Sequence, residues 1–416
     1  MTDLSRGHAE RLDEADPLAG LRREFVDDEP ELIYLDGNSL GRLPKATRER
    51  LAAVVADEWG QGLIRSWARW IDQAAQVGDL LGTALLGAAP GQVMIADSTT
   101  VNLYKLAVAA LDARPGRTVI VTDDDNFPTD RYVLEGLAAR RGGVLRMVHA
   151  DIDQGLALPA LRAAVDADTA LVCLSHVAYR SGAMLDMAEV TGLAHERGAL
   201  MLWDLSHAAG AVPVELDATG ADLAVGCTYK YLNAGPGAPA FLYVRRAAQA
   251  TMRQPIWGWF GQRDQFEMGA SYDPEPTIAR FGTGTPPILG IAAVEEGVRL
   301  LAAAGIDRLR AKGVALTSYL IELADAWLPG CALATPRDPA RRGSHVTLYH
   351  PEAWRIAQAL IAAKVIPDYR TPDRFRLGPA PIYTRFTEVW EAMTRLRDIV
   401  ETKSYARFPA GRTRVT

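Results

Sequence analysis

Short, continuously apolar runs recur along the chain from about residue 90 and predict a parallel β-sheet. Most of them are separated by segments of helical periodicity, the order expected of strand–helix–strand units. Strands buried on both faces are apolar throughout, whereas strands with one solvated face alternate apolar and polar residues. We therefore expect a mainly parallel sheet between helices, with any ligand at the carboxyl ends of the strands. The runs lie at residues 93–96, 118–121, 145–149, 170–174, 199–203 and 221–225.

The pattern changes after about Pro286. An alanine- and leucine-rich helix is predicted over residues 288–304, followed by a second helical region and short strands near 345–349 and 374–377. These features predict a smaller α+β domain beside the α/β domain.

The first thirty residues are acidic and predict a peripheral helix. They lead into a short strand and a tight turn over residues 32–41, in which Gly37 and Asn38 are expected to supply positive φ angles. We predict three parts: an N-terminal segment (1–60) that packs with the smaller domain, a large α/β domain (61–290) and the smaller C-terminal α+β domain (291–416).

Length and composition restrict the class of protein. The 416 residues exceed one ordinary core, and 49% hydrophobic with 23% charged residues is typical of a soluble globular enzyme. The net charge of −6 argues against a nucleic-acid partner. No apolar run approaches the length of a membrane span and the first residues carry no apolar signal segment, so we expect a cytoplasmic protein with no membrane partner.

The cysteines and histidines do not predict a metal site. Cys173, Cys227 and Cys331 are odd in number and far apart, which fits neither a disulfide framework nor a metal cluster. The seven histidines are scattered, and neither HExxH nor CxxC occurs. We expect no metal.

Lys230 is the most informative residue for chemistry. It lies in a glycine-rich turn directly after the run 221–225, where poor solvation disfavours the ammonium form and leaves a nucleophilic amine. Asp204 ends the run 199–203. Pyridoxal phosphate (PLP) requires this pair, because a lysine holds its aldehyde and a carboxylate keeps its pyridine nitrogen protonated. We therefore predict PLP between Lys230 and Asp204.

Thr99 and Thr100 follow Ser98 where a strand gives way to a helix. Hydroxyls and amide N–H groups at a helix start make an anion site. An ordinary N-cap explains the same residues and is the commoner case. Together with Lys230 and Asp204 at other strand ends, a cup for the PLP phosphate is the better interpretation.

Several further residues have both a structural and a functional interpretation. Phe127 could stack on a cofactor ring with Asp130 nearby, or the two could form a turn before a helix with Pro128 at its first position. His207 could be only a satisfied polar residue at a helix start, but its place three residues after Asp204 favours a position in the cofactor floor. Tyr229 could reach the phosphate, act as an acid or simply pack.

Two groups could recognise a substrate. Arg374 and Arg376 alternate in a strand-like run, and a guanidinium is the natural clamp for an α-carboxylate, but the pattern does not choose between them. Trp67 and Trp259 lie in glycine-flanked segments and would suit an aryl substrate.

Taken together, these segments resemble kynureninase, a fold type I PLP enzyme of tryptophan catabolism and NAD biosynthesis. The matching segments span nearly the whole chain in order: YLDGNSLG (34–41), GLIRSW (62–67), NFPTD (126–130), DLSHAAGA (204–211), GCTYKYLNAGPG (226–237), GWFG (258–261), GTPP (284–287) and RLGPAPIY (376–383).

The resemblance implies a role for each matching residue. Lys230 would carry the cofactor and Asp204 would face the pyridine nitrogen, with Phe127, Asp130, Ser175 and His207 around the ring. Thr99, Thr100 and Tyr229 would contact the cofactor and its phosphate, and Trp259 and Thr285 would come from the neighbouring subunit of a homodimer with shared active sites. Arg376, rather than Arg374, would bind the substrate carboxylate, and Trp67 and Ser39 would lie on the substrate side.

The implied reaction is hydrolysis of L-kynurenine to anthranilate and L-alanine, or of 3-hydroxykynurenine to 3-hydroxyanthranilate, with Lys230, Asp204 and Tyr229 as catalytic residues. The alternative is a cysteine-desulfurase-like or other class V PLP enzyme. A desulfurase needs a mobile loop cysteine, and Cys331 is the candidate for it.

Overall fold

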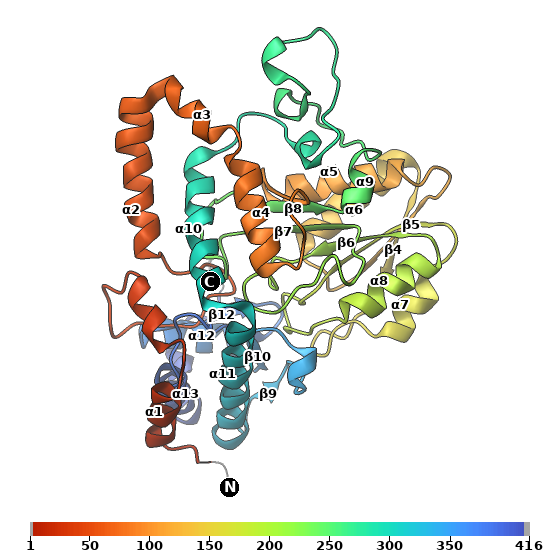
Figure 1. The fold of residues 1–416 in the computed structure, drawn as a ribbon. Coiled ribbons are helices and arrows are strands. Elements are labelled where there is room, and N and C mark those ends of the chain that lie inside the picture. The colour runs from red at the N-terminus through yellow and green to blue at the C-terminus, as the bar shows by residue number, and fades with distance from the viewer. Residues whose placement is uncertain (1–2, 412–416) are drawn as a thin grey trace.

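The computed structural model describes residues 3–411 and shows a large α/β domain beside a smaller α+β domain (Figure 1). The large domain is built on a seven-stranded sheet in the order β2-β8-β7-β6-β5-β3-β4. β7, β6, β5, β3 and β4 are parallel, so the prediction of a mainly parallel sheet is confirmed. The strands are β2 (Val93–Ile95), β3 (Val119–Asp123), β4 (Val144–Val148), β5 (Thr169–Ser175), β6 (Leu200–Asp204), β7 (Leu223–Gly226) and β8 (Phe241–Val244).

β8 was not among the predicted strands. It follows the glycine-rich loop of Lys230 and pairs antiparallel with both β7 and β2. The sheet is therefore mixed at this edge, and the chain returns beside the strand that leads to Lys230.

Helices cover both faces of the sheet. Alternate residues of β6 enter different cores: Leu200 and Leu202 pack with the helices of one face, whereas Met201 and Trp203 pack with those of the other. Burial on both faces explains why the strands are apolar throughout. The first face carries α5 (Thr99–Asp112) and α6 (Pro128–Arg141), and the second α4 (Gln73–Leu85), α7 (Leu158–Ala164), α8 (Met187–Glu196) and α10 (Ile288–Ala304).

The smaller domain has its own sheet, ordered β12-β13-β10-β9 and antiparallel throughout. Its helices pack on one core cluster with the sheet. The elements are α11 (Ile306–Trp327), β9 (Ala332–Leu333), β10 (Val346–Tyr349), α12 (Ala353–Ala362), β11 (Val365–Ile366), β12 (Asp368–Arg370), β13 (Arg374–Leu377) and α13 (Phe386–Glu401).

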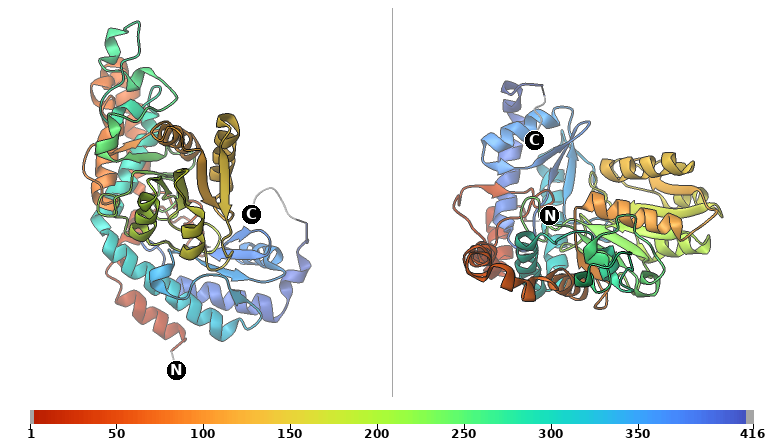
Figure 2. Two further views of the ribbon diagram at one scale, coloured as in Figure 1. Left: turned by 90° about the vertical axis from the view of Figure 1, so that its right-hand side faces the viewer. Right: turned by 90° about the horizontal axis from the view of Figure 1, so that it is seen from above.

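The N-terminal segment packs against the smaller domain (Figure 2). α1 (Arg6–Glu14) lies on α13, and β1 (Ile33–Tyr34) pairs in parallel with β11. α2 (Lys45–Ala53) packs on α10 instead. Because that contact joins the first predicted part to the second, the boundaries at residues 60 and 290 stay a prediction.

The predicted positive φ angles at Gly37 and Asn38 are wrong, since neither residue lies in the left-handed region. Position 37 needs glycine for a different reason. A Cβ atom there would lie 2.9 Å from Cβ of Ala380 and 2.9 Å from Oη of Tyr383. The turn thus depends on close approach to the smaller domain.

No helix within residues 3–411 combines the length and apolar character that crossing a membrane requires.

Candidate active site

Lys230 lies in the bend that follows β7, at the carboxyl end of the parallel strands. Its side chain is half-buried, and its Nζ atom is 3.3 Å from Nε2 of His207. The same Nζ lies 5.9 Å from the ring centroids of both Phe127 and Tyr229. The structure therefore brings together four of the residues selected from the sequence.

Two carboxyl groups lie next to each other in this region. Asp204 is the last residue of β6, is 5% exposed, and accepts a hydrogen bond from the Ser206 N–H at 2.8 Å. Asp130, in the first turn of α6, is 2% exposed and interacts with Asp204. Burial, and then the charge of Asp204, raise the pKa of Asp130 well above its ordinary value. The pair therefore holds one negative charge more easily than two.

This pair fits the pyridine nitrogen of PLP. The Oδ2 atom of Asp130 is buried with no hydrogen-bond partner among residues 3–411. A protonated ring nitrogen would offset the charge of the carboxyl pair, and Lys230 provides the amine for the aldehyde at the other end of the ring. Asp204, Asp130 and Lys230 are thus the residues that would hold the cofactor.

Phe127 and Ser175 flank the same space. Phe127 is 37% exposed, precedes α6, and meets the ring of Tyr179 edge-on at 5.4 Å between centroids. Ser175, at the end of β5, donates to Oδ1 of Asn126 at 2.8 Å. Pro128 is the first residue of α6, so the structural interpretation of this turn is confirmed, and the stacking of Phe127 on a cofactor ring stays a prediction.

His207 and His345 form a buried pair of rings with centroids 5.7 Å apart. Burial lowers the pKa of both far below the ordinary value, and the charges of Lys230 and Arg376 add to the effect at each. Both imidazoles are therefore neutral at physiological pH. Neither ring nitrogen of His345 has a hydrogen-bond partner among residues 3–411.

Thr99 and Thr100 are the first two residues of α5, with Ser98 as the N-cap. The Ser98 hydroxyl accepts from the Val101 N–H at 3.4 Å, so the ordinary N-cap is present. The turn before α5 is tied to the loop of Lys230, because Ala240 donates its N–H to the Asp97 carbonyl at 2.9 Å. A helix start beside the lysine loop is a suitable phosphate site.

The two candidate arginines differ in their partners. Arg374 forms a bidentate pair with Asp153, with both N···O distances 2.9 Å. Arg376 is 1% exposed and bonds to Asp368 and to the carbonyl of Tyr179. It also donates to Ser39 Oγ at 3.2 Å. The structure thus places Arg376 and Ser39 together, and Tyr179 links them to Phe127.

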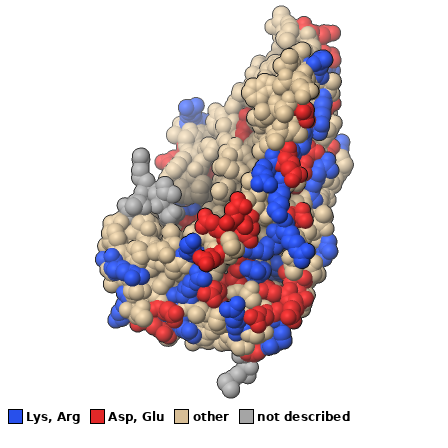
Figure 3. Space-filling model, turned by 90° about the vertical axis from the view of Figure 1, so that its left-hand side faces the viewer, with Lys and Arg blue, Asp and Glu red and all other residues tan. Residues whose placement is uncertain are grey.

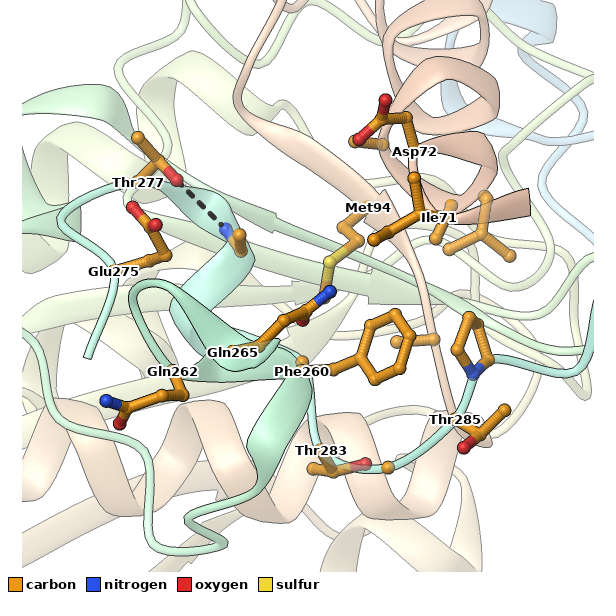
Figure 4. Close-up of a pocket in the computed structure, with 18 of the residues that line it drawn as sticks. Ile71, Asp72, Met94, Phe260, Gln262, Gln265, Glu275, Thr277, Thr283 and Thr285 are labelled. Carbon is orange, nitrogen blue, oxygen red and sulfur yellow. Dashed lines mark hydrogen bonds between the residues drawn. The ribbon is translucent and has the colours of Figure 1, made fainter. Parts of the chain in front are cut away.

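Trp67, Trp259 and Thr285 belong to a different region of this subunit. Trp67 lies 6.0 Å from Phe260 between ring centroids, and Trp259 lies 4.5 Å from Phe260. Thr285, Phe260 and Met94 line a cavity of about 960 Å³ (Figure 4). Figure 1 shows the green-to-turquoise segment of residues 257–285, which precedes α10, projecting from the large domain and away from the smaller domain.

Sequence reasoning missed several residues of the site. Asn126 opens the matching segment NFPTD but was given no role, and Tyr179 and His345 lie in no matching segment. Asp36 is part of the segment YLDGNSLG and Asp368 precedes Arg370, but only strand pairing shows that both lie near Arg376.

The fold and the lysine–carboxylate site define a fold type I PLP-dependent enzyme. Solved structures support the fold alone. A cysteine desulfurase from Thermococcus onnurineus NA1 superposes with a TM-score of 0.82 at 19% identity, covering 92% of this chain and 98% of that one. The cysteine desulfurase CsdA from Escherichia coli superposes with a TM-score of 0.79 at 15% identity, covering 93% and 98%.

Sequence comparison is more specific. The model for the kynureninase C-terminal domain matches residues 309–396, and that for the DegT/DnrJ/EryC1/StrS aminotransferase family matches residues 91–219. The chain is 48% identical to kynureninase from Pseudomonas fluorescens over 408 residues, with 95% of each chain covered. It is 46% identical to kynureninase from Burkholderia pseudomallei (strain 1106a), covering 96% of this chain and 97% of that one. The chain belongs to the kynureninase family, and its cofactor is PLP.

Proposed function

We propose that the protein hydrolyses the Cβ–Cγ bond of L-kynurenine, giving anthranilate and L-alanine, and that it also accepts 3-hydroxykynurenine. The observation that carries the proposal is the placement of Lys230 and Asp204 at the ends of adjacent parallel strands, β7 and β6, in a chain of this family. When bound, PLP supplies a ring that accepts the electrons left by bond cleavage at the substrate.

The residues around Lys230 suit proton transfer. Its amine is the group best placed to move the proton at the substrate Cα. The imidazole of His207 is neutral and its Nε2 lies 3.3 Å from the amine, so it can hold the amine in position by a hydrogen bond. Tyr229 lies next to Lys230, and burial raises the pKa of its phenol. A phenol that keeps its proton at neutral pH can donate it to the substrate Cβ, which becomes the methyl carbon of L-alanine. We therefore assign the later proton transfers to Tyr229.

Substrate recognition is divided between two regions. Arg376 would bind the α-carboxylate, with Ser39 beside it. Trp67 and Trp259 would contact the aryl ring, and Thr99, Thr100 and Thr285 the cofactor phosphate. Replacing either tryptophan by alanine should weaken kynurenine handling far more than PLP binding.

The position of Trp259 supports a homodimer. Its segment projects from the large domain and carries exposed apolar side chains, with Trp257 64%, Phe266 62% and Met268 70% exposed. Figure 3 shows a largely uncharged surface at the projecting end of the molecule. A patch of this kind on a projecting segment is typical of a subunit interface. We propose that Trp259 and Thr285 complete the active site of the partner subunit.

We propose that the enzyme works in the cytoplasm, in tryptophan catabolism and NAD biosynthesis. We expect it to act on a small-molecule substrate and to have no nucleic-acid partner. The net charge of −6 supports the last assignment. Among residues 3–411, no three His, Cys, Asp or Glu side chains gather as metal ligands would.

The desulfurase alternative is not favoured. Cys331 lies in the turn between α11 and β9 and packs against the core of the smaller domain. Burial raises the pKa of its thiol to about 11, which is the opposite of what a nucleophilic thiolate needs.

The test is an assay of the PLP-loaded enzyme with L-kynurenine, 3-hydroxykynurenine and L-cysteine. We expect anthranilate from L-kynurenine and 3-hydroxyanthranilate from 3-hydroxykynurenine, each in an amount equal to the L-alanine formed with it. We expect no sulfide from L-cysteine. Sulfide release without anthranilate would favour the desulfurase instead. Borohydride reduction followed by peptide mapping should place the PLP label on Lys230, and a label on another lysine would contradict the site.

A further inference from the structure

Arg376 is held on several sides before any substrate binds. Its Nη2 donates to Asp368 and to Ser39 Oγ, and its Nη1 donates to the Tyr179 carbonyl. With the Asn38 amide turned so that its oxygen faces the guanidinium, that oxygen accepts from Nε at 3.2 Å and from Nη2 at 3.0 Å. A guanidinium has five N–H donors, so most of the set is engaged at a residue that is 1% exposed. A substrate carboxylate must join this arrangement rather than meet a free cation.

Asp368 is the carboxylate that organises the arrangement. It lies on β12 directly across from Arg376 on β13, at a cross-strand pair. Its Oδ1 accepts from Nη1 of Arg370 at 2.7 Å, and its Oδ2 accepts from Arg376 and, at 2.9 Å, from the Ser39 hydroxyl. One buried carboxylate therefore serves two guanidinium groups.

Asp36 adds a second carboxyl to the same cluster. It follows β1, and its backbone bridges to Gly378, two residues beyond Arg376. Its Oδ1 atom is buried with no hydrogen-bond partner among residues 3–411. The groups that act on it or respond to it come from each neighbouring segment: Asp368 and Arg370 on β12, Arg376 on β13, Ser39 and Tyr34 on its own segment, and Tyr231 in the loop of Lys230.

The charge of the cluster around Arg376 depends on whether Asp36 carries a proton. With both aspartates ionised, two carboxylates balance the guanidinium groups of Arg370 and Arg376. A substrate α-carboxylate would then leave one uncompensated negative charge in a buried site, which is costly. With a proton on Asp36 the cluster carries one positive charge, and the substrate carboxylate makes it neutral.

We propose that Asp36 is a positioning residue of the substrate-carboxylate site, which takes up a proton when the carboxylate binds so that Arg376 can keep Asp368 as its permanent partner. The proposal rests on the proposed function, through the role of Arg376. It goes further by making substrate binding depend on the protonation of a residue that does not itself contact the reacting atoms.

The electrostatics of Asp36 support this step. Burial, and then the charge of Asp368, raise its pKa from 3.8 to about 7, while Ser39 and the two arginines act in the other direction. A second carboxylate on Arg376 would raise the pKa further. Above about pH 7 the free enzyme has lost this proton, so carboxylate binding becomes weaker by up to about tenfold per pH unit.

The first test measures proton uptake by the PLP-loaded enzyme, using calorimetry in two buffers of different ionisation enthalpy at about pH 8. The probes are L-alanine, which carries the α-carboxylate, and L-alaninamide, which lacks it. The uptake with each probe is corrected for the ionisation of its free amine, because the amine beside an amide has the lower pKa. After this correction, we expect the enzyme to take up close to one proton per site more with L-alanine than with L-alaninamide. Equal uptake for the two probes would overturn the proposal, and this measurement needs no variant to fold.

The second test compares Asp36→Asn with a matched control, Asp153→Asn, which removes the carboxylate bound to Arg374 on the same strand. In the wild type and the control, KM for L-kynurenine should rise above about pH 7 by up to about tenfold per unit. In Asp36→Asn, KM should stay near its low-pH value while kcat keeps its wild-type pH profile. A KM that rises equally in all three would overturn the proposal.

The two failures are distinguishable. If L-kynurenine is not hydrolysed at all, the proposed function fails, and the comparison of L-alanine with L-alaninamide still decides the role of Asp36. If L-kynurenine is hydrolysed and its KM depends on pH in the same way in the wild type and in Asp36→Asn, only the inference about Asp36 fails.

Discussion

Nζ of Lys230 lies 3.3 Å from Nε2 of His207, and the imidazole is buried. Burial and the charge of Lys230 lower the pKa of His207 well below its ordinary value, so the ring stays neutral and its Nε2 can accept a hydrogen bond from the lysine. The amine is thereby held in one direction without a competing positive charge. This contact holds Nζ of Lys230 near the ring of Phe127, whose centroid is 5.9 Å away.

Replacing Lys230 by alanine removes the amine from this arrangement. We expect kcat for L-kynurenine to fall by at least about a thousandfold, the scale of losing a group that acts in both attachment and proton transfer. Borohydride should no longer fix PLP to the protein. Lys364→Ala, at an exposed lysine whose ion-pair distances are 4.0 Å, is the control and should keep full activity. Near-normal turnover in Lys230→Ala would contradict the assignment.

A second lysine, Lys105, links the proposed phosphate site to the segment of Thr285. It is fully buried and its Nζ binds Oδ2 of Asp97 at 2.6 Å and the Phe281 carbonyl at 2.7 Å, while Thr283 donates to Oδ1 of Asp97 at 3.2 Å. Lys105→Met should lower the free energy of unfolding by about 3 kcal/mol, because it leaves Asp97 without its cation. It should also weaken PLP binding, since Asp97 precedes the start of α5.

The matched control is Lys312→Met. Lys312 pairs with Asp16 at 2.7 Å and is also buried, but it lies at the junction of α11 with the N-terminal segment. Urea unfolding should show a loss of stability in both variants, whereas a PLP titration should show weaker binding in Lys105→Met alone. An unchanged PLP affinity in Lys105→Met would mean that Lys105 serves only the fold.

The strand ends that carry the chemistry could be predicted from local sequence. Lys230 and Asp204 each follow an apolar run, and adjacent parallel strands end at the same edge of a sheet, so their proximity follows from the pattern. The partners of Arg376 could not be predicted in this way. Asp368 meets Arg376 only because β12 and β13 pair in one register, and Asp36 joins them only because the N-terminal segment packs on the smaller domain.

Turn geometry and the antiparallel edge were also beyond local reasoning. Gly37 looks like a residue chosen for positive φ, but its neighbours Ala380 and Tyr383 are more than 340 residues away in the chain, so the steric reason is visible only in the fold. β8 follows a loop rather than a helix, so an alternation of strands and helices does not predict it.

His176 should make the stability of the fold depend on pH. It is 4% exposed, its ring meets Trp203 edge-on at 5.8 Å, and burial lowers its pKa from 6.5 to about 4. Because the unfolded chain binds this proton below about pH 6.5 and the folded chain does not until about pH 4, the stabilising contribution is present above pH 6.5 and is lost as the pH falls. The loss is about 1.4 kcal/mol per pH unit.

His176→Gln removes this dependence. Urea unfolding of the wild type and the variant at about pH 7.5 and about pH 5 gives two stability differences. The wild type should lose about 2 kcal/mol relative to the variant between the two conditions. The comparison cancels any constant cost of the substitution, such as the lost contact with Trp203. A difference that is the same at both pH values would show that His176 titrates normally.

The shared active site can be tested by mixing two variants that each lack one residue of the site, and by comparing the mixture with each variant alone. If Trp259 completes the site of the partner subunit, a hybrid dimer of Lys230→Ala and Trp259→Ala has one site with both residues intact. Random exchange makes about half of the dimers hybrid, so about a quarter of wild-type activity should return. Two different affinity tags, purified in sequence, would isolate the hybrids.

As a control, Lys230→Ala mixed with Asp204→Ala should recover no activity. Both residues lie in the same subunit's site, so each site of that hybrid lacks one of them. Absence of recovery in isolated Lys230→Ala/Trp259→Ala hybrids would place Trp259 in the site of its own subunit.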